Sequence, residues 1–120
     1  MREIKFRAWE EDTHYMNDNV RITRTMGETF YEVSEAFGWI EVKPEHVMQH
    51  TGRKDSEGNE IYEGDILQSE HYFKYQVIFK GDCWRCEPVK NNRLKNRFIG
   101  SDLKVIGNIY ENPELLDRQQ

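Results

Sequence analysis

The chain has 120 residues, of which 37% are hydrophobic and 32% are charged, and its formal net charge is −5 at pH 7. This length fits one domain. The three Trp, six Tyr and six Phe residues supply large rings that can close a small core, and such a content excludes a largely disordered chain. The sequence holds no run of about eighteen apolar residues, which excludes a membrane-spanning helix.

Two features indicate the compartment. The first residues, MREIKFRAWE, lack the apolar stretch of a secretory signal. The only cysteines, Cys83 and Cys86, are too few for a disulfide scaffold. We therefore expect a protein of a reducing cytoplasm, not one inserted in a membrane.

Short strands are predicted along the first third of the chain. Residues 4–9 alternate apolar and charged side chains with period two, which predicts a half-buried strand with Ile4 facing inward and Arg7 outward. After a polar turn, further strands are predicted at 20–25, 29–33 and 38–43. Residues 44–50 predict a short helical turn that Gly52 ends, because proline suits the first position of a helix.

The most organised stretch is TGRKDSEGNEIYEGDIL, residues 51–67, which crowds glycines and acids ahead of an apolar strand. We interpret it as architecture, because glycine reaches positive φ without steric cost and Asp favours turns. Asp65 is expected to accept backbone N–H bonds, since it lies directly after a glycine and before a buried strand. The predicted turn residues are Gly52, Asp55, Gly58, Gly64 and Asp65.

The C-terminal half carries the clearest strand pattern. The predicted elements are a strand at 74–80, its hairpin partner at 83–89, a polar and basic loop at 91–96, and a last strand at 103–110. Gly81-Asp82 is the expected hairpin turn. Gly107 is expected at a bulge or a close backbone approach, and Pro113 at the start of a final helical turn.

These short strands, spaced by about ten residues, predict a mainly β fold. We expect a small SH3-like or partly open β-barrel with an N-terminal β extension and one or two short helical turns. No linker divides the chain, so residues 1–120 are interpreted as a single domain. Residues 1–43 also qualify as an N-terminal β subdomain beside a C-terminal barrel at residues 50–112.

Metal-binding patterns are weak. Cys83 and Cys86 have the spacing of zinc ligands, and His46 and His50 would complete a tetrahedral site. Two residues three apart on a strand point to opposite faces, however, which favours two separate thiols and leaves zinc as the alternative. The acids of residues 51–67 do not follow a calcium loop, in which glycine occupies the sixth position. We interpret them as solvated turn acids, with Asp65 as the exception.

Catalytic patterns are also missing. The sequence has neither G-x-S-x-G nor a P-loop, and its four histidines lie in polar or turn contexts. We therefore expect no enzyme, no cofactor and no metal.

Charge is distributed unevenly. The segment from Lys74 to Arg97 contains seven basic and two acidic residues, so it carries a net charge of +5 and the rest of the chain carries −10. Aromatic residues lie among these cations, a combination that stacks bases and contacts phosphates in nucleic-acid-binding proteins. The overall negative charge opposes that function at long range, which favours a solvated or protein-facing patch. The candidate patch residues are Lys74, Lys80, Trp84, Arg85, Lys90, Arg93, Lys95 and Arg97.

Three blocks carry a family resemblance. They are KFRAW at residues 5–9, TGRKD at 51–55 followed by GNEIYEGDI at 58–66, and VIGNIYENPEL at 105–115. These blocks resemble the YopX family of small phage and prophage proteins, over nearly the whole chain. The resemblance implies a YopX-like, phage-derived, largely β protein of the host bacterial cytoplasm, and it implies no particular activity.

The expected function is therefore that of a non-enzymatic phage or prophage accessory protein. It would bind a host or phage protein, and the strand edges of a small β domain also favour self-association into a homo-oligomer. The alternative is nucleic-acid binding through residues 74–97.

Overall fold

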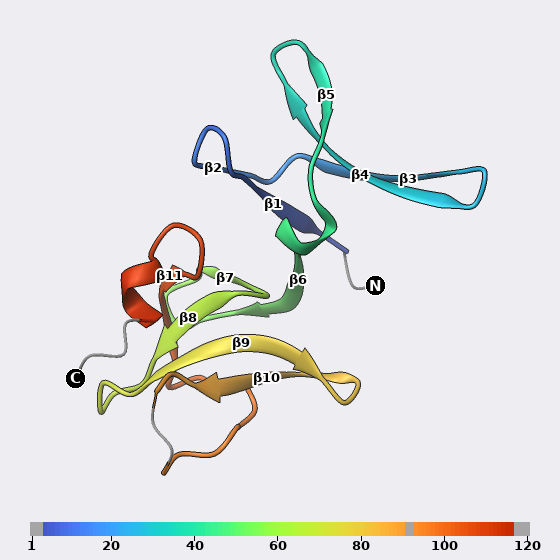
Figure 1. Ribbon diagram of the computed structural model, residues 1–120. Coiled ribbons are helices and arrows are strands. Elements are labelled where there is room, and N and C mark those ends of the chain that lie inside the picture. Colours follow the sequence, from blue (N-terminus) through green and yellow to red (C-terminus); the bar gives the residue numbers. More distant parts are fainter. Residues whose placement is uncertain (1–3, 91–92, 117–120) are drawn as a thin grey trace. The chain divides into compact units, whose positions relative to one another are not determined.

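The computed structural model describes residues 4–90 and 93–116, and its elements are mainly strands, which confirms the expected fold class. Within this part of the chain, residues 4–50 form one unit, and residues 51–90 with 93–116 form a second (Figure 1). Strand β6 (Val47–Lys54) belongs to both units. Its first residues pair with β1 in unit 1, and the strand neighbours β7 in unit 2.

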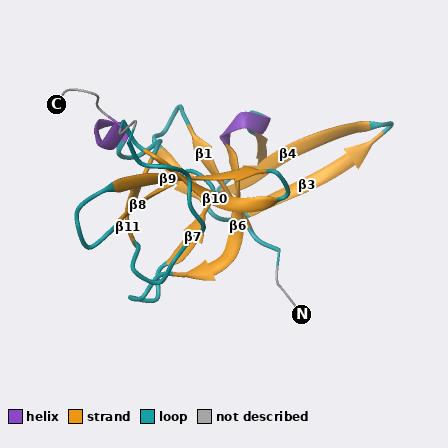
Figure 2. Ribbon diagram, turned by 90° about the horizontal axis from the view of Figure 1, so that it is seen from below, coloured by secondary structure: helices purple, strands orange, loops and turns teal. Residues whose placement is uncertain are grey.

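Unit 1 consists of short antiparallel strands. They are β1 (Phe6–Glu10), β2 (Tyr15–Asn17), β3 (Val20–Thr25), β4 (Glu28–Glu35) and β5 (Gly38–Glu41), followed by the 3₁₀ turn η1 (Pro44–His46). Strands β3, β4 and β5 pair in that order as a separate sheet, and β3 and β4 form a long hairpin in both views (Figures 1 and 2). The bounds of β3 confirm the strand predicted at 20–25.

The β3-β4-β5 sheet has two chemically different faces. On one face Val33 is fully buried and stands opposite Ile40 of β5. On the other face Arg21 forms an ion pair of 2.8 Å with Glu32 and lies 4.2 Å from the centroid of the Trp39 ring. Alternation of side chains along the strands thus separates an apolar face from an ion-paired face.

One sequence prediction for unit 1 is confirmed only in part, and another is wrong. The helical turn expected over 44–50 covers only Pro44–His46, and the chain then continues as β6, in which Val47 pairs with Ala8 and Met48 is buried. Pairing with a strand some forty positions earlier overrides the weak local helical signal. Ile4, expected to face inward, has 69% of its surface exposed because it precedes the paired part of β1.

Unit 2 is built around a sheet with the strand order β10-β9-β8-β11, which curls as an open half-barrel (Figure 1). Its elements are β7 (Glu60–Tyr62), β8 (Asp65–Gln68), β9 (Lys74–Lys80), β10 (Cys83–Pro88), β11 (Lys104–Asn108) and the 3₁₀ turn η2 (Pro113–Leu116). The core cluster comprises Ile61, Leu67, Tyr75, Val77, Cys86, Ile99 and Leu103.

The β9–β10 hairpin confirms the strongest sequence signal. Lys80 pairs with Cys83, and the intervening Gly81 and Asp82 have φ values of 62° and 70°. Positive φ at both central positions is the requirement of a type I′ turn, whose twist matches that of the flanking strands. The local sequence therefore fixes the register of this hairpin.

Gly107 combines a bulge with a close approach, as expected. The register of β11 against β8 shifts between Val105 and Gly107. A Cβ atom at Gly107 would lie 2.5 Å from Oδ1 of Asn112 and 2.9 Å from Cδ1 of Leu115. The turn η2 thus packs directly against backbone at this point.

Gly64 and Asp65 connect β7 to β8. Gly64 has a φ of 87°, its N–H donates to the carbonyl oxygen of Val77 and its own carbonyl accepts from the N–H of Ile109, both at 3.0 Å. The carboxylate of Asp65, a residue only 1% exposed, accepts the N–H of Tyr62 at 2.8 Å. This turn is therefore bonded to strand β9 and to the end of β11.

Replacing Gly64 by valine is expected to lower the free energy of unfolding by more than about 1 kcal/mol, because a β-branched side chain is strained at positive φ. Gly64→Asn is the matched control, since asparagine tolerates the left-handed region and should lose less. Urea denaturation followed by tryptophan fluorescence measures both variants. Wild-type stability in Gly64→Val would contradict the constraint on this backbone.

Candidate interaction surface

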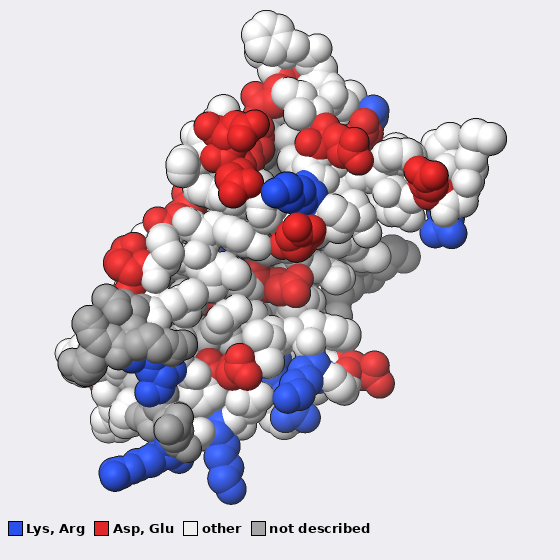
Figure 3. Space-filling view, in the orientation of Figure 1, with Lys and Arg blue, Asp and Glu red and all other residues white. Residues whose placement is uncertain are grey.

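The structure spreads the cations of the basic segment over several places. Lys74 and Lys80 occupy the two ends of β9, about 20 Å apart at the rise of a strand. Lys90, Arg93 and Lys95 are exposed and lie after β10, and the loop residues 91–92 are outside the described part of the chain. On the face shown in Figure 3, basic side chains gather at the β9–β10 end of unit 2, whereas acidic ones predominate over unit 1.

Arg97 connects the loop after β10 to the rest of unit 2 through its side chain and its backbone. Its guanidinium forms a bidentate ion pair with Asp102 at 2.7 and 3.0 Å. The pKa of Asp102 lies below its usual value, chiefly because Arg97 donates these hydrogen bonds. The backbone of Arg97 exchanges two further hydrogen bonds with Cys86, at 2.7 and 3.0 Å. This bridge holds residues 97–99 against the edge of β10.

Phe98 and Ile99 complete a groove on unit 2. Ile99 is buried in the core, and the neighbouring Phe98 turns outward with 64% of its surface exposed. The groove has a volume of about 380 Å³. It is called the aromatic groove below, and it is lined by Thr51, Gly52, Arg53, Trp84, Phe98 and Ile99.

Aromatic and basic side chains meet at the aromatic groove. Trp84 packs against the core and contacts Phe79 edge to face, with ring centroids 4.9 Å apart. Phe79 remains 54% exposed. The guanidinium carbon of Arg85 lies 5.0 Å from the centroid of the Phe98 ring, within the range of a cation–π contact. Of the predicted patch, Trp84 lines the groove, and Arg85 contacts the groove residue Phe98.

Arg53 also lines this groove, although no sequence pattern predicts it there. The sequence predicts Gly52 at the end of a helical turn, whereas Gly52 lies within β6 with a φ of 87°. The hydroxyl of Thr51 donates to the carbonyl oxygen of Ile61 at 2.8 Å, which fixes this part of β6 in unit 2. Residues 47–54, VMQHTGRK, do not alternate apolar and polar side chains, so no period-two pattern marks this strand in the sequence.

The two cysteines occupy different environments. Cys86 is fully buried in the core, and burial raises the pKa of its thiol to about 11. Cys83 Sγ lies 3.6 Å from the carbonyl oxygen of Lys80. Across residues 4–90 and 93–116, His, Cys, Asp and Glu side chains form no group of three or more that could hold a metal ion.

Asp55 corrects the expectation that the acids of residues 51–67, apart from Asp65, are solvated. Only 7% of Asp55 is exposed. One carboxylate oxygen accepts the N–H groups of Glu57 and Asn59 at 2.9 and 2.8 Å, and the other accepts the N–H of Val105 at 3.0 Å. Gly58, with a φ of 87°, completes this turn.

The electrostatics of Asp55 follow from this geometry. Burial is the largest single influence and raises the pKa of Asp55. The hydrogen bonds from Val105, Asn59 and Glu57 together outweigh burial, and the net pKa lies below its usual value. The folded protein therefore favours the ionised carboxylate.

The protein has a small, mainly β fold. Its unit 2 carries the aromatic groove on its surface. The chain belongs to the YopX family, because the family model described as YopX protein matches residues 5–117. This match confirms the resemblance seen in the sequence.

Two solved structures are similar over nearly the whole chain. The crystal structure of protein EF1440 from Enterococcus faecalis has 24% sequence identity and a TM-score of 0.59, with 98% of this chain and 100% of that chain covered. The crystal structure of protein yopX from Bacillus subtilis has 20% identity and a TM-score of 0.60, with the same coverage. These similarities show a shared fold.

Comparison with curated proteins gives no match. Within the described residues, no helix has the length and apolar character needed to span a membrane.

Replacing Asp55 by asparagine is expected to lower the free energy of unfolding at neutral pH by about 2 kcal/mol, because charge-assisted bonds to three N–H groups are weakened. The matched control is Glu57→Gln in the same turn. Its carboxylate forms an exposed ion pair of 3.2 Å with Lys104, and such a pair contributes roughly 0–1 kcal/mol. Urea denaturation of both variants measures the difference.

The difference in stability between wild type and Asp55→Asn should also depend on pH. Because the folded pKa of Asp55 is depressed, its contribution is full above the unfolded value of about 3.9 and is lost as pH falls through the folded pKa. Denaturation curves below about pH 4 should therefore converge. A constant difference down to the acid transition would contradict the role of the ionised carboxylate.

Proposed function

We propose that this YopX-family protein is a non-enzymatic accessory protein of a phage or prophage that binds another protein in the bacterial cytoplasm. The aromatic groove of unit 2 is the binding surface. The observation that carries the proposal is the exposure of Phe79 and Phe98 beside this groove. The chain belongs to the YopX family, and the phage and prophage setting is what its resemblance to that family implies.

The composition of the surface fits a protein partner. Aromatic and arginine side chains are the residues that contribute most to protein–protein binding energy. Here Arg53 and Phe98 both line the groove, and Arg85 contacts the ring of Phe98. A partner segment with an apolar anchor and acidic neighbours is complementary to this arrangement.

The same geometry argues against the nucleic-acid alternative. A groove that binds a single strand needs cations placed along a continuous track beside stacking rings. Lys74 and Lys80 lie at opposite ends of β9, and Arg97 forms its ion pair with Asp102. The cations nearest the rings are too few to form such a track.

Affinity capture from lysogenic bacterial cells tests the proposal, with nuclease added to remove bridging nucleic acid. The variant carries Phe79→Ser and Phe98→Ser. The control is Tyr72→Ser, which removes an aromatic ring that is 77% exposed elsewhere in unit 2. We expect wild type and control to retain one protein that the double variant loses.

Calorimetry with that purified partner should then show that the double variant binds at least about tenfold more weakly. Thermal denaturation verifies that both variants remain folded. Equal capture by all three proteins would contradict the proposed surface.

Measuring the affinity for single-stranded DNA and RNA distinguishes the proposed protein binding from the alternative of nucleic-acid binding. Under the proposal, affinity is weak and insensitive to charge reversal at Arg93 and Lys95. A steep loss of affinity with salt, abolished by those reversals, would instead establish nucleic-acid binding.

A further inference from the structure

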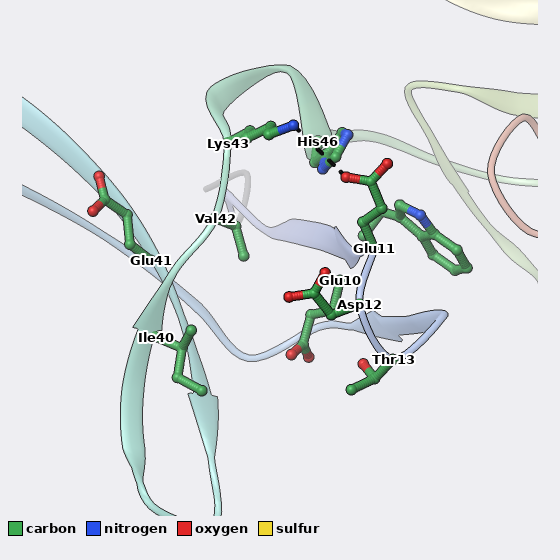
Figure 4. Close-up of a pocket in the computed structure, with 10 residues that line it drawn as sticks. Glu10, Glu11, Asp12, Thr13, Ile40, Glu41, Val42, Lys43 and His46 are labelled. Carbon is green, nitrogen blue, oxygen red and sulfur yellow. Dashed lines mark ion pairs between the residues drawn. The ribbon is translucent and has the colours of Figure 1, made fainter.

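Unit 1 contains a second groove, separate from the aromatic groove and lined by residues of unit 1 alone. It lies between residues 9–13, where β1 runs into the following turn, and residues 40–46, which run from β5 into η1 (Figure 4). Its volume is about 250 Å³, below the roughly 300–1,000 Å³ of pockets that hold drug-sized ligands. This space suits one long side chain better than a whole small molecule. It is called the acidic groove below.

The wall formed by β5 and the following link is apolar. Ile40 and Val42 are two positions apart, so their side chains share a face and point toward the groove in Figure 4. Ile40 is 46% exposed although it continues the face on which Val33 is fully buried. An aliphatic stem could cover this wall.

The opposite wall is negatively charged. Glu10, Glu11 and Asp12 are consecutive, and the carboxylates of Glu10 and Asp12 lie toward the middle of the groove in Figure 4. The one lysine of the lining, Lys43, lies against Glu11 at 3.7 Å. Because Lys43 is paired with Glu11, the carboxylates of Glu10 and Asp12 leave the groove with a net negative charge.

A second carboxyl group, that of Glu35, lies beside Glu10. Burial, followed by the adjacent Glu35 carboxyl, raises the pKa of Glu10, whereas the hydrogen bond from Asn17 at 2.9 Å acts in the opposite direction. A cation placed here would relieve the repulsion between the two carboxyl groups.

We propose that the acidic groove is a docking site for an arginine side chain of a partner protein. The stem of the arginine covers Ile40 and Val42, and its planar guanidinium bonds to the carboxylates of Glu10 and Asp12. Arginine fits better than lysine, because its fork of N–H donors serves two carboxylates at once. This goes beyond the proposed function, since it adds a binding site of opposite charge on the other unit.

A titration followed by NMR tests this docking site on the full chain. The probe is the peptide acetyl-Gly-Arg-Gly-amide, and the control probe replaces arginine with citrulline, its uncharged isostere. Saturable amide shifts confined to residues 9–13 and 40–46 are expected with the arginine peptide, together with at least about fivefold weaker binding of the citrulline peptide.

Matched variants locate the charge. Asp12→Asn should weaken arginine binding by about fivefold. Glu41→Gln makes the same change in charge on the groove lining, but its carboxylate points away from the groove in Figure 4, and it should weaken binding by less than about twofold. Equal effects of the two variants, or equal binding of both peptides, would overturn the proposal.

Analytical sedimentation of the protein without peptide tests whether a second copy of this chain occupies the acidic groove. Self-association that Asp12→Asn abolishes would identify a second copy of this chain as the occupant and overturn the proposal. None of these variants changes the aromatic groove, so failure here is distinguishable from failure of the proposed function.

Discussion

The carboxylate of Asp55 joins two parts of unit 2 that are far apart in sequence. It accepts N–H groups within its own turn and the N–H of Val105, fifty positions later. Burying a carboxylate is costly unless hydrogen bonds satisfy it, and here the bonds outweigh the burial, since the pKa is lowered. The bond to Val105 fixes the start of β11 immediately before the bulge that precedes Gly107. Gly64 then closes the other end of β11 through Ile109.

The aromatic groove depends on this frame through the core. Leu103, directly before β11, and Cys86 belong to the same buried cluster. Cys86 exchanges backbone hydrogen bonds with Arg97, and Arg97 is held by Asp102. A Cβ atom at Gly100 would lie 2.5 Å from this guanidinium, so the loop needs glycine or a displaced ion pair. The position of Phe98 is therefore a consequence of the packing beneath it.

The sequence predicted those features whose causes are local. Gly81 and Asp82 specify the β9–β10 turn, Pro113 begins the last 3₁₀ turn, and Gly107 marks the bulge. The sequence did not predict features whose conformation or burial depends on residues far away in the chain. Strand β6 forms because β1 pairs with it, and Asp55 is buried because β11 covers it. For the candidate site, composition indicated aromatic and basic residues together, but only the fold selects Arg53 and Arg85 from the cations of the chain.

Within the described residues, unit 1 has fewer buried hydrophobic side chains than unit 2, and part of its apolar surface stays exposed. In the β3-β4-β5 sheet, Val33 is fully buried while Ile40 remains exposed. Polar bonds also connect the strands: the amide of Asn17 donates to Glu10 and to the carbonyl oxygen of Ser34, at 2.9 and 3.0 Å. Because Asn17 is itself buried, these bonds are protected from competing water. Glu10 thus has a structural role on one side and lines the acidic groove on the other. Removing its charge would alter both, whereas Asp12 is free of that bond to Asn17 and is the position where docking can be changed apart from folding.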